Sequence, residues 1–259
     1  MQILGLTEGA SRRKQLELKK LGKLALNIFI VTLLLPIIVY ILFYYGIISS
    51  SGRSADASFE AAIALVQTPT GLSGTAFIVG ESTLLTACHV VEGLETGTVV
   101  TLLFDKADPP INTTALLSWK DKNYSLDPAI TKYGSDLAVL KLVNPTEVPE
   151  DYVPRLTFGD SDEISNGTDV LSVGYPDGEY LLAPGAISNT SYMDYDFVFQ
   201  TTADAYPGNS GGPLLLKDSK DVIGMMLFVR TGEFAGINFA NKINNIDNIL
   251  YSNGIDYSE

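Results

Sequence analysis

Residues Pro207–Leu214 read Pro-Gly-Asn-Ser-Gly-Gly-Pro-Leu, a string in which one serine is surrounded by glycines. A serine hydroxyl is a poor nucleophile unless a base takes its proton, and the negative oxygen formed by its attack on a carbonyl needs preorganised donors. Glycines allow a tight turn in which the backbone N–H groups of Gly208 and Ser210 converge on one point. Gly211 and Gly212 leave room for a substrate backbone. The alternative is an ordinary glycine-rich hairpin loop, although this string is far more specific than a lone Gly-Ser-Gly.

Two earlier segments hold the groups that such a serine would need. Leu85–Val91 contains His89, which is the only histidine of the chain and follows an apolar strand-like run. A histidine there could act as a general base, or it could be a satisfied polar residue at a strand end. Ser135–Leu142 places Asp136 directly before another apolar run. An aspartate could hold the imidazole in one tautomer, or it could simply start a strand.

The pattern from Phe59 onward is one of short strand-like runs separated by Gly, Pro, Asn and Asp. Such spacing predicts an all-β sandwich or barrel rather than alternating strands and helices. The proline-rich segment Asn144–Pro154 is typical of a linker between two β units, since proline removes backbone donors. Apolar residues at helical spacing after residue 242 predict one C-terminal helix. The predicted strands are Ala61–Val66, Thr75–Val79, Thr83–Thr86, Thr98–Phe104, Ala115–Trp119, Leu137–Leu142, Val170–Val173, Phe197–Thr202, Gly212–Leu216, Val222–Val229 and Phe234–Phe239.

Taken in the order His89, Asp136, Ser210, the three segments resemble the trypsin/chymotrypsin-like serine peptidases. The bacterial HtrA/Deg branch matches best, through Thr86–Val90, Asp136–Leu140 and Gly208–Leu214. The resemblance implies an all-β fold of two six-stranded antiparallel barrels, the first about 59–143 and the second about 155–242, with a C-terminal helix at 243–251. It also implies a serine endopeptidase that acts on proteins or peptides in quality control or processing.

The same resemblance assigns a role to each residue of the site. His89 would be the general base, Asp136 would orient it, and Ser210 would form the acyl-enzyme. The N–H groups of Gly208 and Ser210 would form the oxyanion hole. Asp204 lies six residues before Ser210, where the trypsin family places the base of the specificity pocket. A carboxylate there would favour Lys or Arg at the cleavage site, whereas HtrA-like enzymes usually prefer small apolar residues, which would leave Asp204 in a solvated loop.

Some features depart from the wider trypsin family. Asn209 stands before the serine where zymogen-activated trypsins carry an aspartate, so activation by N-terminal cleavage is not expected. The 49 residues after Ser210 leave no room for a PDZ domain. A trimer, which the HtrA/Deg branch often forms, rests on the resemblance alone.

The N-terminal part of the chain differs in composition from the rest. Residues 1–45 carry a net charge of +4 and residues 46–259 a net charge of −17, and no charged residue occurs between Leu24 and Gly52. The apolar run 24–48 is longer than the roughly 20 residues that cross a bilayer as a helix. The basic residues before it predict a cytoplasmic tail at 1–23, a tether at 49–58 and an extracytoplasmic catalytic domain at 59–259. A signal peptide cleaved near Ala55-Asp56-Ala57 is the alternative.

Composition excludes several classes of function. One cysteine and one histidine rule out disulfides and Cys- or His-built metal sites, so we expect no cofactor and no metal. A net charge of −13 argues against nucleic-acid binding. Two rivals to the peptidase remain. One is a catalytically silent, membrane-tethered binding module, and the other is a non-proteolytic serine hydrolase, which is disfavoured because those of the Gly-x-Ser-x-Gly type place the histidine last.

Overall fold

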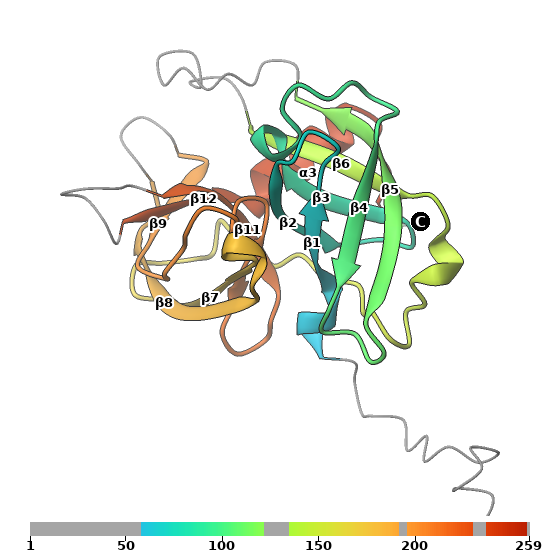
Figure 1. Cartoon of the computed structure of the whole chain (residues 1–259). Coiled ribbons are helices and arrows are strands. Elements are labelled where there is room, and N and C mark those ends of the chain that lie inside the picture. The colour runs from blue at the N-terminus through green and yellow to red at the C-terminus, as the bar shows by residue number, and fades with distance from the viewer. Residues whose placement is uncertain (1–57, 122–134, 192–195, 230–236, 258–259) are drawn as a thin grey trace, which may run out of the picture. The chain divides into compact units, whose positions relative to one another are not determined.

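The computed structural model describes residues 58–121, 135–191, 196–229 and 237–257. Within these residues the twelve strands form two closed antiparallel barrels of six strands each, followed by one α-helix. Figure 1 shows the two barrels side by side, the first in blue to green and the second mainly in orange and red. The predicted all-β class, the two barrels and the C-terminal helix are therefore confirmed.

The first barrel has the strand order β1-β2-β3-β6-β5-β4 and the second has the order β10-β11-β12-β9-β8-β7. Short 3₁₀ turns occupy Phe59–Ala62, Cys88–Val91, Pro145–Glu147 and Pro176–Gly178. The strands and the helix are β1 (Ile63–Gln67), β2 (Ser73–Ile78), β3 (Thr83–Ala87), β4 (Val99–Phe104), β5 (Ile111–Lys120), β6 (Leu137–Leu142), β7 (Asp169–Gly174), β8 (Leu181–Asn189), β9 (Val198–Thr201), β10 (Pro213–Leu216), β11 (Val222–Val229), β12 (Asn238–Lys242) and α3 (Ile243–Ser252).

Burial along the strands shows which side of the first barrel faces the second. In β4 buried residues alternate with more accessible ones, as expected for a strand with one face in the core and one toward solvent. All five residues of β3 are buried, and so are five of the six in β2 and in β6. The two barrels meet where β3 contacts β11 and where β1 and β2 contact β7. The ends of β2, β3 and β6 therefore lie where residues of both barrels can share one site.

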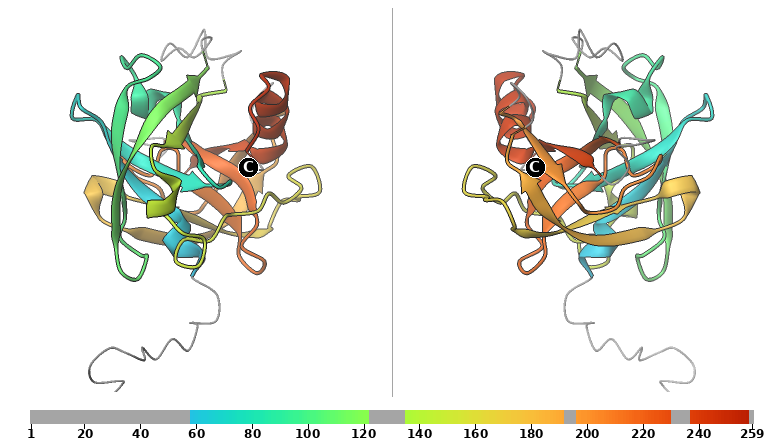
Figure 2. Two further views of the ribbon diagram at one scale, coloured as in Figure 1. Left: turned by 90° about the vertical axis from the view of Figure 1, so that its right-hand side faces the viewer. Right: turned by 90° about the vertical axis from the view of Figure 1, so that its left-hand side faces the viewer.

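Helix α3 covers part of this junction (Figure 2). Its buried residues Ile243, Ile246 and Leu250 recur at the spacing of one helix face and belong to the same hydrophobic cluster as the core of the first barrel. The helix also contacts β11 and β12 of the second barrel. The last element of the chain thus helps to hold the two barrels together.

Most strand predictions agree with the structure to within two residues at each end, and three do not. Strand β5 begins at Ile111, four residues before the predicted Ala115–Trp119. Strand β8 (Leu181–Asn189) was not predicted, because Pro184 and Gly185 interrupt its sequence as they would interrupt a loop. The last strand was predicted at Phe234–Phe239, of which 234–236 lie outside the described residues, and β12 continues to Lys242. Its second half contains Asn241, a polar residue that is fully buried, so hydropathy alone ended the strand too early.

The predicted membrane span at 24–48 lies outside the described residues. Within the residues that the structure describes, no helix has both the length and the apolar character needed to cross a bilayer.

Replacing Ile246 of α3 by alanine tests the role of this helix. Ile246 has no exposed surface, so Ile246→Ala should lower the free energy of unfolding by about 2–5 kcal/mol through lost burial and the cavity that it leaves. The exposed residue Asn248 lies on the same helix, and Asn248→Ala should change stability by less than about 0.5 kcal/mol. Urea denaturation of the purified full-length chain measures both values, and similar losses for the two variants would contradict the packing described.

Candidate active site

His89 and Asp136 are joined by a short contact in the first barrel. His89 lies in the 3₁₀ turn Cys88–Val91 that follows β3, and its ring Nδ1 is 2.7 Å from Asp136 Oδ2. The backbone N–H of His89 also donates to Asp136 Oδ1 at 3.0 Å, and the N–H of Cys88 donates to the Asp136 carbonyl at 2.9 Å. The aspartate therefore holds both the ring and the backbone of the histidine segment.

The backbone of Asp136 adopts a left-handed conformation with φ +48° immediately before β6. Asp and Asn enter this region more readily than most residues. The adjoining Ser135 is fixed from two sides, because its N–H donates to Asp121 Oδ2 at 2.6 Å and its carbonyl accepts from Asn241 Nδ2 at 2.8 Å. Asn241 belongs to β12, so the second barrel helps to position the carboxylate that faces His89.

Ser210 lies in the turn before β10 of the second barrel and reaches across to the first. Its carbonyl accepts a hydrogen bond from the N–H of Thr75 in β2 at 3.0 Å. Its hydroxyl donates to the carbonyl of Leu227 at 3.2 Å.

The segment Pro207–Gly212, here called the serine turn, contains Ser210. Gly211 shows how closely this turn approaches the segment that carries His89. A Cβ built on Gly211 would lie 2.4 Å from the carbonyl oxygen of Thr75 and 2.6 Å from the nitrogen of Ala87, two residues before His89. Gly211 also has φ +82°. The glycine is therefore required both by its backbone conformation and by the lack of space, and the structure brings the predicted histidine, aspartate and serine segments together.

Gly208, predicted as an oxyanion-hole residue, has φ +110° and lies against the second barrel's own backbone. A Cβ at this position would be 2.4 Å from the carbonyl oxygen of Tyr175. Only glycine fits this conformation without strain. The backbone N–H of Gly208 and that of Ser210 belong to one short turn, and their role as an oxyanion hole stays a prediction.

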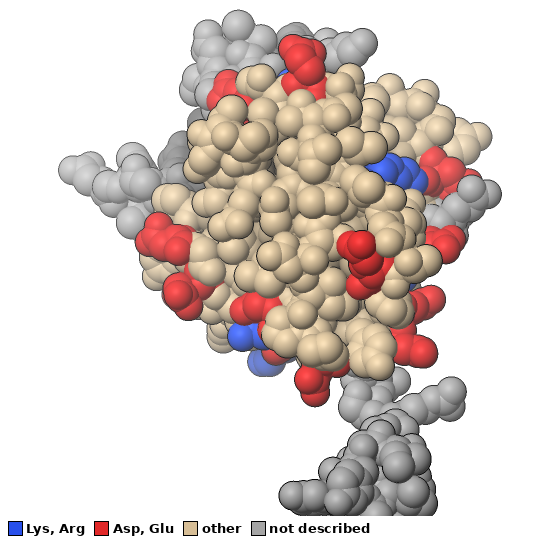
Figure 3. All heavy atoms as spheres, turned by 45° about the vertical axis from the view of Figure 1, so that its right-hand side comes forward, with Lys and Arg blue, Asp and Glu red and all other residues tan. Residues whose placement is uncertain are grey.

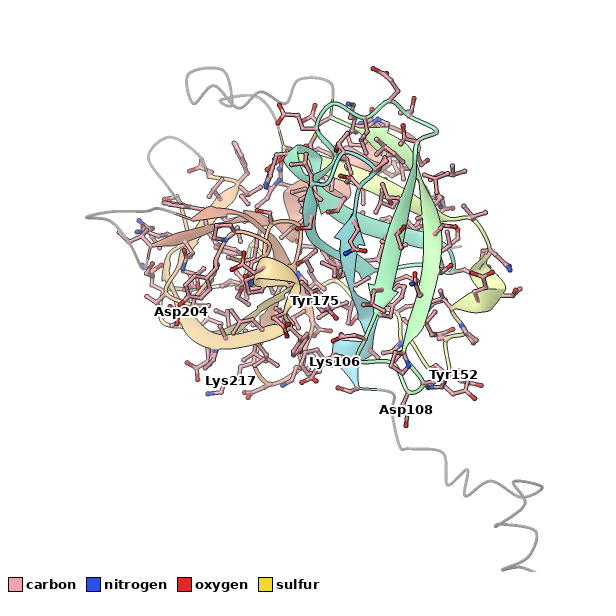
Figure 4. All side chains as sticks on the ribbon, viewed as in Figure 1. Lys106, Asp108, Tyr152, Tyr175, Asp204 and Lys217 are labelled. Carbon is pink, nitrogen blue, oxygen red and sulfur yellow. The ribbon has the colours of Figure 1, made fainter. Side chains whose placement is uncertain are left out.

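A small pocket of about 30 Å³ adjoins Ser210. It is lined by Ala205, Tyr206, Pro207, Asn209, Ser210, Met226 and Leu227. Asp204 is not among these residues and is exposed, and Figure 4 places it on the flank of the second barrel away from the first. The structure thus brings together His89, Asp136, Gly208 and Ser210 but does not place Asp204 at the pocket beside them.

Two features of the surroundings bear on chemistry at this site. Cys88, next to His89, is buried, and burial together with the charge of Asp136 raises the pKa of its thiol to about 12. The thiol is therefore protonated at neutral pH and is no competing nucleophile. Among the residues that the structure describes, no three His, Cys, Asp or Glu side chains gather as a metal-binding group.

The charged surface is dominated by carboxylates. Figure 3 shows Asp and Glu at many places on the face drawn there and far fewer Lys and Arg. This distribution agrees with the net charge of −17 over residues 46–259. A field of this sign attracts cationic molecules and repels anionic ones.

Sequence reasoning missed two residues that connect the site to the barrel junction. Thr75 is a buried polar residue in an apolar strand, and that contrast is the only signal the sequence gives. Tyr175 follows β7 in a Gly-Tyr-Pro string that gives no signal of its role. Its hydroxyl donates to Asp105 and lies 3.2 Å from the carbonyl of Ile63, both in the first barrel, and Figure 4 places it between the barrels.

The comparison with family models identifies the class of protein that this fold and site define. The model described as "Trypsin-like peptidase domain" matches residues 74–225. Because the match covers more than half of the chain, the protein belongs to the trypsin-like peptidase domain family.

Individual relatives are consistent with this family. Proteins named "Probable periplasmic serine endoprotease DegP-like" from Hahella chejuensis and Halomonas elongata are 33% and 34% identical over 178 and 175 residues. These alignments cover 65% and 64% of this chain and 32% of each relative, so the chain spans about a third of the length of the curated relatives that it matches.

Solved structures agree with the fold. The HtrA-type protease AlgW with a tripeptide has a TM-score of 0.60 at 26% identity, covering 76% of this chain and 61% of that chain. The active form of the Rv3671c protease from M. tuberculosis has a TM-score of 0.56 at 22% identity, covering 75% and 82%. The second likeness concerns the fold alone.

Alanine substitution at two glycines separates the effect of backbone conformation from that of space. Gly167 has φ +89° but nothing within 4 Å of a built Cβ, so Gly167→Ala should cost about 1–2 kcal/mol through strain alone. Gly211→Ala should cost about 1–3 kcal/mol more, because the methyl group would meet backbone atoms of the first barrel. Urea denaturation of the two full-length variants measures the difference, and equal losses would show that the serine turn does not press against the first barrel.

Proposed function

We propose that the protein is a membrane-anchored serine endopeptidase that hydrolyses peptide bonds of extracytoplasmic proteins through His89, Asp136 and Ser210. The observation that carries the proposal is the paired His89 and Asp136 of one barrel beside the glycine-lined serine turn of the other. Membership of the trypsin-like peptidase domain family supports the same reaction class.

The proposed reaction begins when Ser210 Oγ attacks the scissile carbonyl. His89 takes the proton of the hydroxyl and returns it to the leaving amine. Water then attacks the acyl-enzyme ester while His89 takes its proton, and the return of that proton to Ser210 Oγ releases the acyl group as a carboxylic acid. Asp136 keeps Nδ1 of the ring protonated and turned toward itself, which leaves Nε2 as the base and stabilises the imidazolium. The N–H groups of Gly208 and Ser210 stabilise the negative oxygen of the tetrahedral intermediate.

The pocket beside Ser210 supports a preference for small side chains at the cleavage site. Its volume of about 30 Å³ and its Ala, Met and Leu lining suit an alanine or valine side chain. A long basic side chain would need more depth and a carboxylate at the base, and Asp204 is exposed instead. We therefore favour small apolar residues over Lys or Arg.

The anchor and the location of the catalytic domain rest on the sequence and on relatives. The apolar run 24–48 would hold the chain in a lipid bilayer, with residues 1–23 in the cytoplasm. The curated relatives from Hahella chejuensis and Halomonas elongata are named periplasmic, which agrees with a catalytic domain outside the cytoplasm.

Removing the hydroxyl of Ser210 tests the proposed chemistry. In the purified full-length chain, Ser210→Ala should lower kcat on a peptide substrate by about 10⁴- to 10⁶-fold and abolish labelling by an active-site fluorophosphonate. The exposed residue Ser219 provides a matched control, and Ser219→Ala should behave as wild type. Sequencing the peptides that the wild-type enzyme produces from a substrate should show cleavage after Ala or Val. The Asp204→Ala variant should cleave at the same positions.

Other outcomes of this experiment are equally informative. A folded wild-type chain that neither cleaves peptides nor reacts with the fluorophosphonate would replace the peptidase with the catalytically silent binding module. Cleavage after Lys or Arg that is lost in Asp204→Ala would overturn the preference for small residues.

Expression of the full-length chain in a bacterium tests the anchor. The protein should remain with the membranes after alkaline carbonate extraction and keep its original N-terminus. Leu34→Arg, in the middle of the apolar run, should weaken insertion by about 2.5–3.5 kcal/mol, which favours release from the membrane. A soluble protein whose N-terminus lies near Ala57 would instead indicate a cleaved signal peptide.

A further inference from the structure

Every polar atom of Thr75 in β2 makes a hydrogen bond, and two of these bonds reach the serine turn of the other barrel. The Thr75 N–H donates to the carbonyl of Ser210 at 3.0 Å, and the Thr75 hydroxyl donates to the carbonyl of Gly208 at 2.6 Å. The same hydroxyl accepts from the N–H of Tyr175 at 3.0 Å, and the Thr75 carbonyl accepts from the Thr86 hydroxyl at 2.7 Å. The residue has no exposed surface.

These bonds fix two peptide planes of the serine turn at both ends. In the plane between Gly208 and Asn209, the carbonyl is held by Thr75 and the N–H donates to the carbonyl of Tyr206 at 2.9 Å. In the plane between Ser210 and Gly211, the carbonyl is held by Thr75 and the N–H donates to the carbonyl of Met226 at 2.9 Å. The plane between Asn209 and Ser210, which carries the Ser210 N–H, lies between two fixed neighbours.

The turn needs such restraint because its glycine does not supply it. Gly208 has φ +110° and no side chain, so its own conformational preferences do not set the direction of its N–H. Hydrogen-bond donors stabilise a developing negative charge only when they already point at the place where it forms. By holding the planes on both sides of the Ser210 N–H, Thr75 restrains the direction of that donor, and its bond to the Gly208 carbonyl holds the residue that carries the other donor.

Thr75 is itself confined by the second barrel. A Cβ on Gly174 would lie 2.8 Å from Thr75 Oγ1, and a Cβ on Gly212 would lie 3.2 Å from Thr75 Cγ2. Tyr175, whose N–H binds the Thr75 hydroxyl, is anchored to the first barrel through its own hydroxyl. The bond from the Tyr175 N–H and the bond to the Gly208 carbonyl together hold the threonine hydroxyl in the orientation that faces Gly208.

From these contacts we infer that Thr75 is a positioning residue for the oxyanion hole. It acts through Gly208 and Ser210 without touching the substrate, and it ties the geometry of the hole to the packing of the two barrels. The inference rests on the proposed function, because it assigns to Thr75 the task of orienting donors for the transition state of peptide hydrolysis.

Substitution of Thr75 in the full-length chain tests this role, because a positioning residue for the transition state should affect kcat much more than KM. Thr75→Val keeps the branched shape and removes the hydroxyl, and it should lower kcat by about 10- to 100-fold while KM changes less than about threefold. Thr75→Ser restores the hydroxyl and should recover kcat to within about threefold of wild type. The buried Thr113 of β5, whose hydroxyl donates to Glu147 at 2.6 Å, provides the control, and Thr113→Val should keep the wild-type kcat.

A ligand that forms an oxyanion separates positioning from general damage. The affinity of a peptidyl trifluoromethyl ketone, which adds to a serine as an oxyanion, should fall in Thr75→Val by the same factor as kcat/KM. Binding of an ordinary peptide is measured in chains that also carry Ser210→Ala, so that the peptide is not cleaved. In these chains the peptide should bind with the same affinity whether residue 75 is threonine or valine.

The other possible results would overturn either the proposed peptidase function or the positioning role of Thr75. If the folded wild-type chain does not turn over, the proposed function is wrong. If wild type turns over and Thr75→Val keeps kcat within about threefold, the positioning role is wrong. Equal losses of ketone and peptide affinity would also overturn it. If Thr75→Val and Thr75→Ala both fail to fold, as judged by circular dichroism, while Thr75→Ser folds, the hydroxyl is structural and the positioning role is again overturned.

Discussion

The hydrogen bond from the Thr75 N–H to the Ser210 carbonyl joins the two parts of the candidate active site, which lie on different barrels. His89 and Asp136 belong to the first barrel and Ser210 to the second, so neither barrel alone contains the three side chains. Apolar packing between the barrels supplies much of the attraction, but it is non-directional and would tolerate a small slide. Directional contacts at β2 remove that freedom, because a shift of one ångström would break them.

The fold could be predicted from the sequence wherever strands follow ordinary patterns of hydrophobicity. The all-β class and the division into two β units follow from runs such as Leu137–Leu142 and from the proline-rich segment before residue 155, and the C-terminal helix follows from the apolar spacing after residue 242. The two six-stranded barrels were implied by the family resemblance alone. Prediction failed at β8, where Pro184 and Gly185 lie within a strand, and at the end of β12, where a buried asparagine is satisfied by a carbonyl of the other barrel. At β12 the compensating hydrogen bond reaches Ser135, far away in the chain, whereas β8 is held by pairing with the neighbouring strand β7, which its own sequence does not reveal.

Some residues of the candidate site could likewise be predicted from the sequence and others could not. The sequence pointed to His89, Asp136, Gly208 and Ser210 because each lies in a distinctive local string. It could not reveal Thr75 or Tyr175, because their importance comes from partners more than a hundred residues distant. Asp204 was considered from its spacing to Ser210 alone. Spacing places a residue in a pocket only when the intervening loop has the right path, and here the exposed Asp204 is not among the residues that line the pocket, although its neighbour Ala205 is.

The polar contacts at the barrel junction also explain why the site can be rigid in so small a protein. A buried hydroxyl or amide is costly without a hydrogen-bond partner, so donors that find their partners in one arrangement of the barrels penalise other arrangements. Thr75, Thr86 and Asn241 each donate to a carbonyl at 2.6–2.8 Å, and each of these bonds lies at or beside the junction. A slide of one barrel against the other would leave several of these groups without a hydrogen-bond partner at the same time. The barrels therefore have one favourable docking arrangement, and it is the arrangement that brings the serine turn beside the histidine.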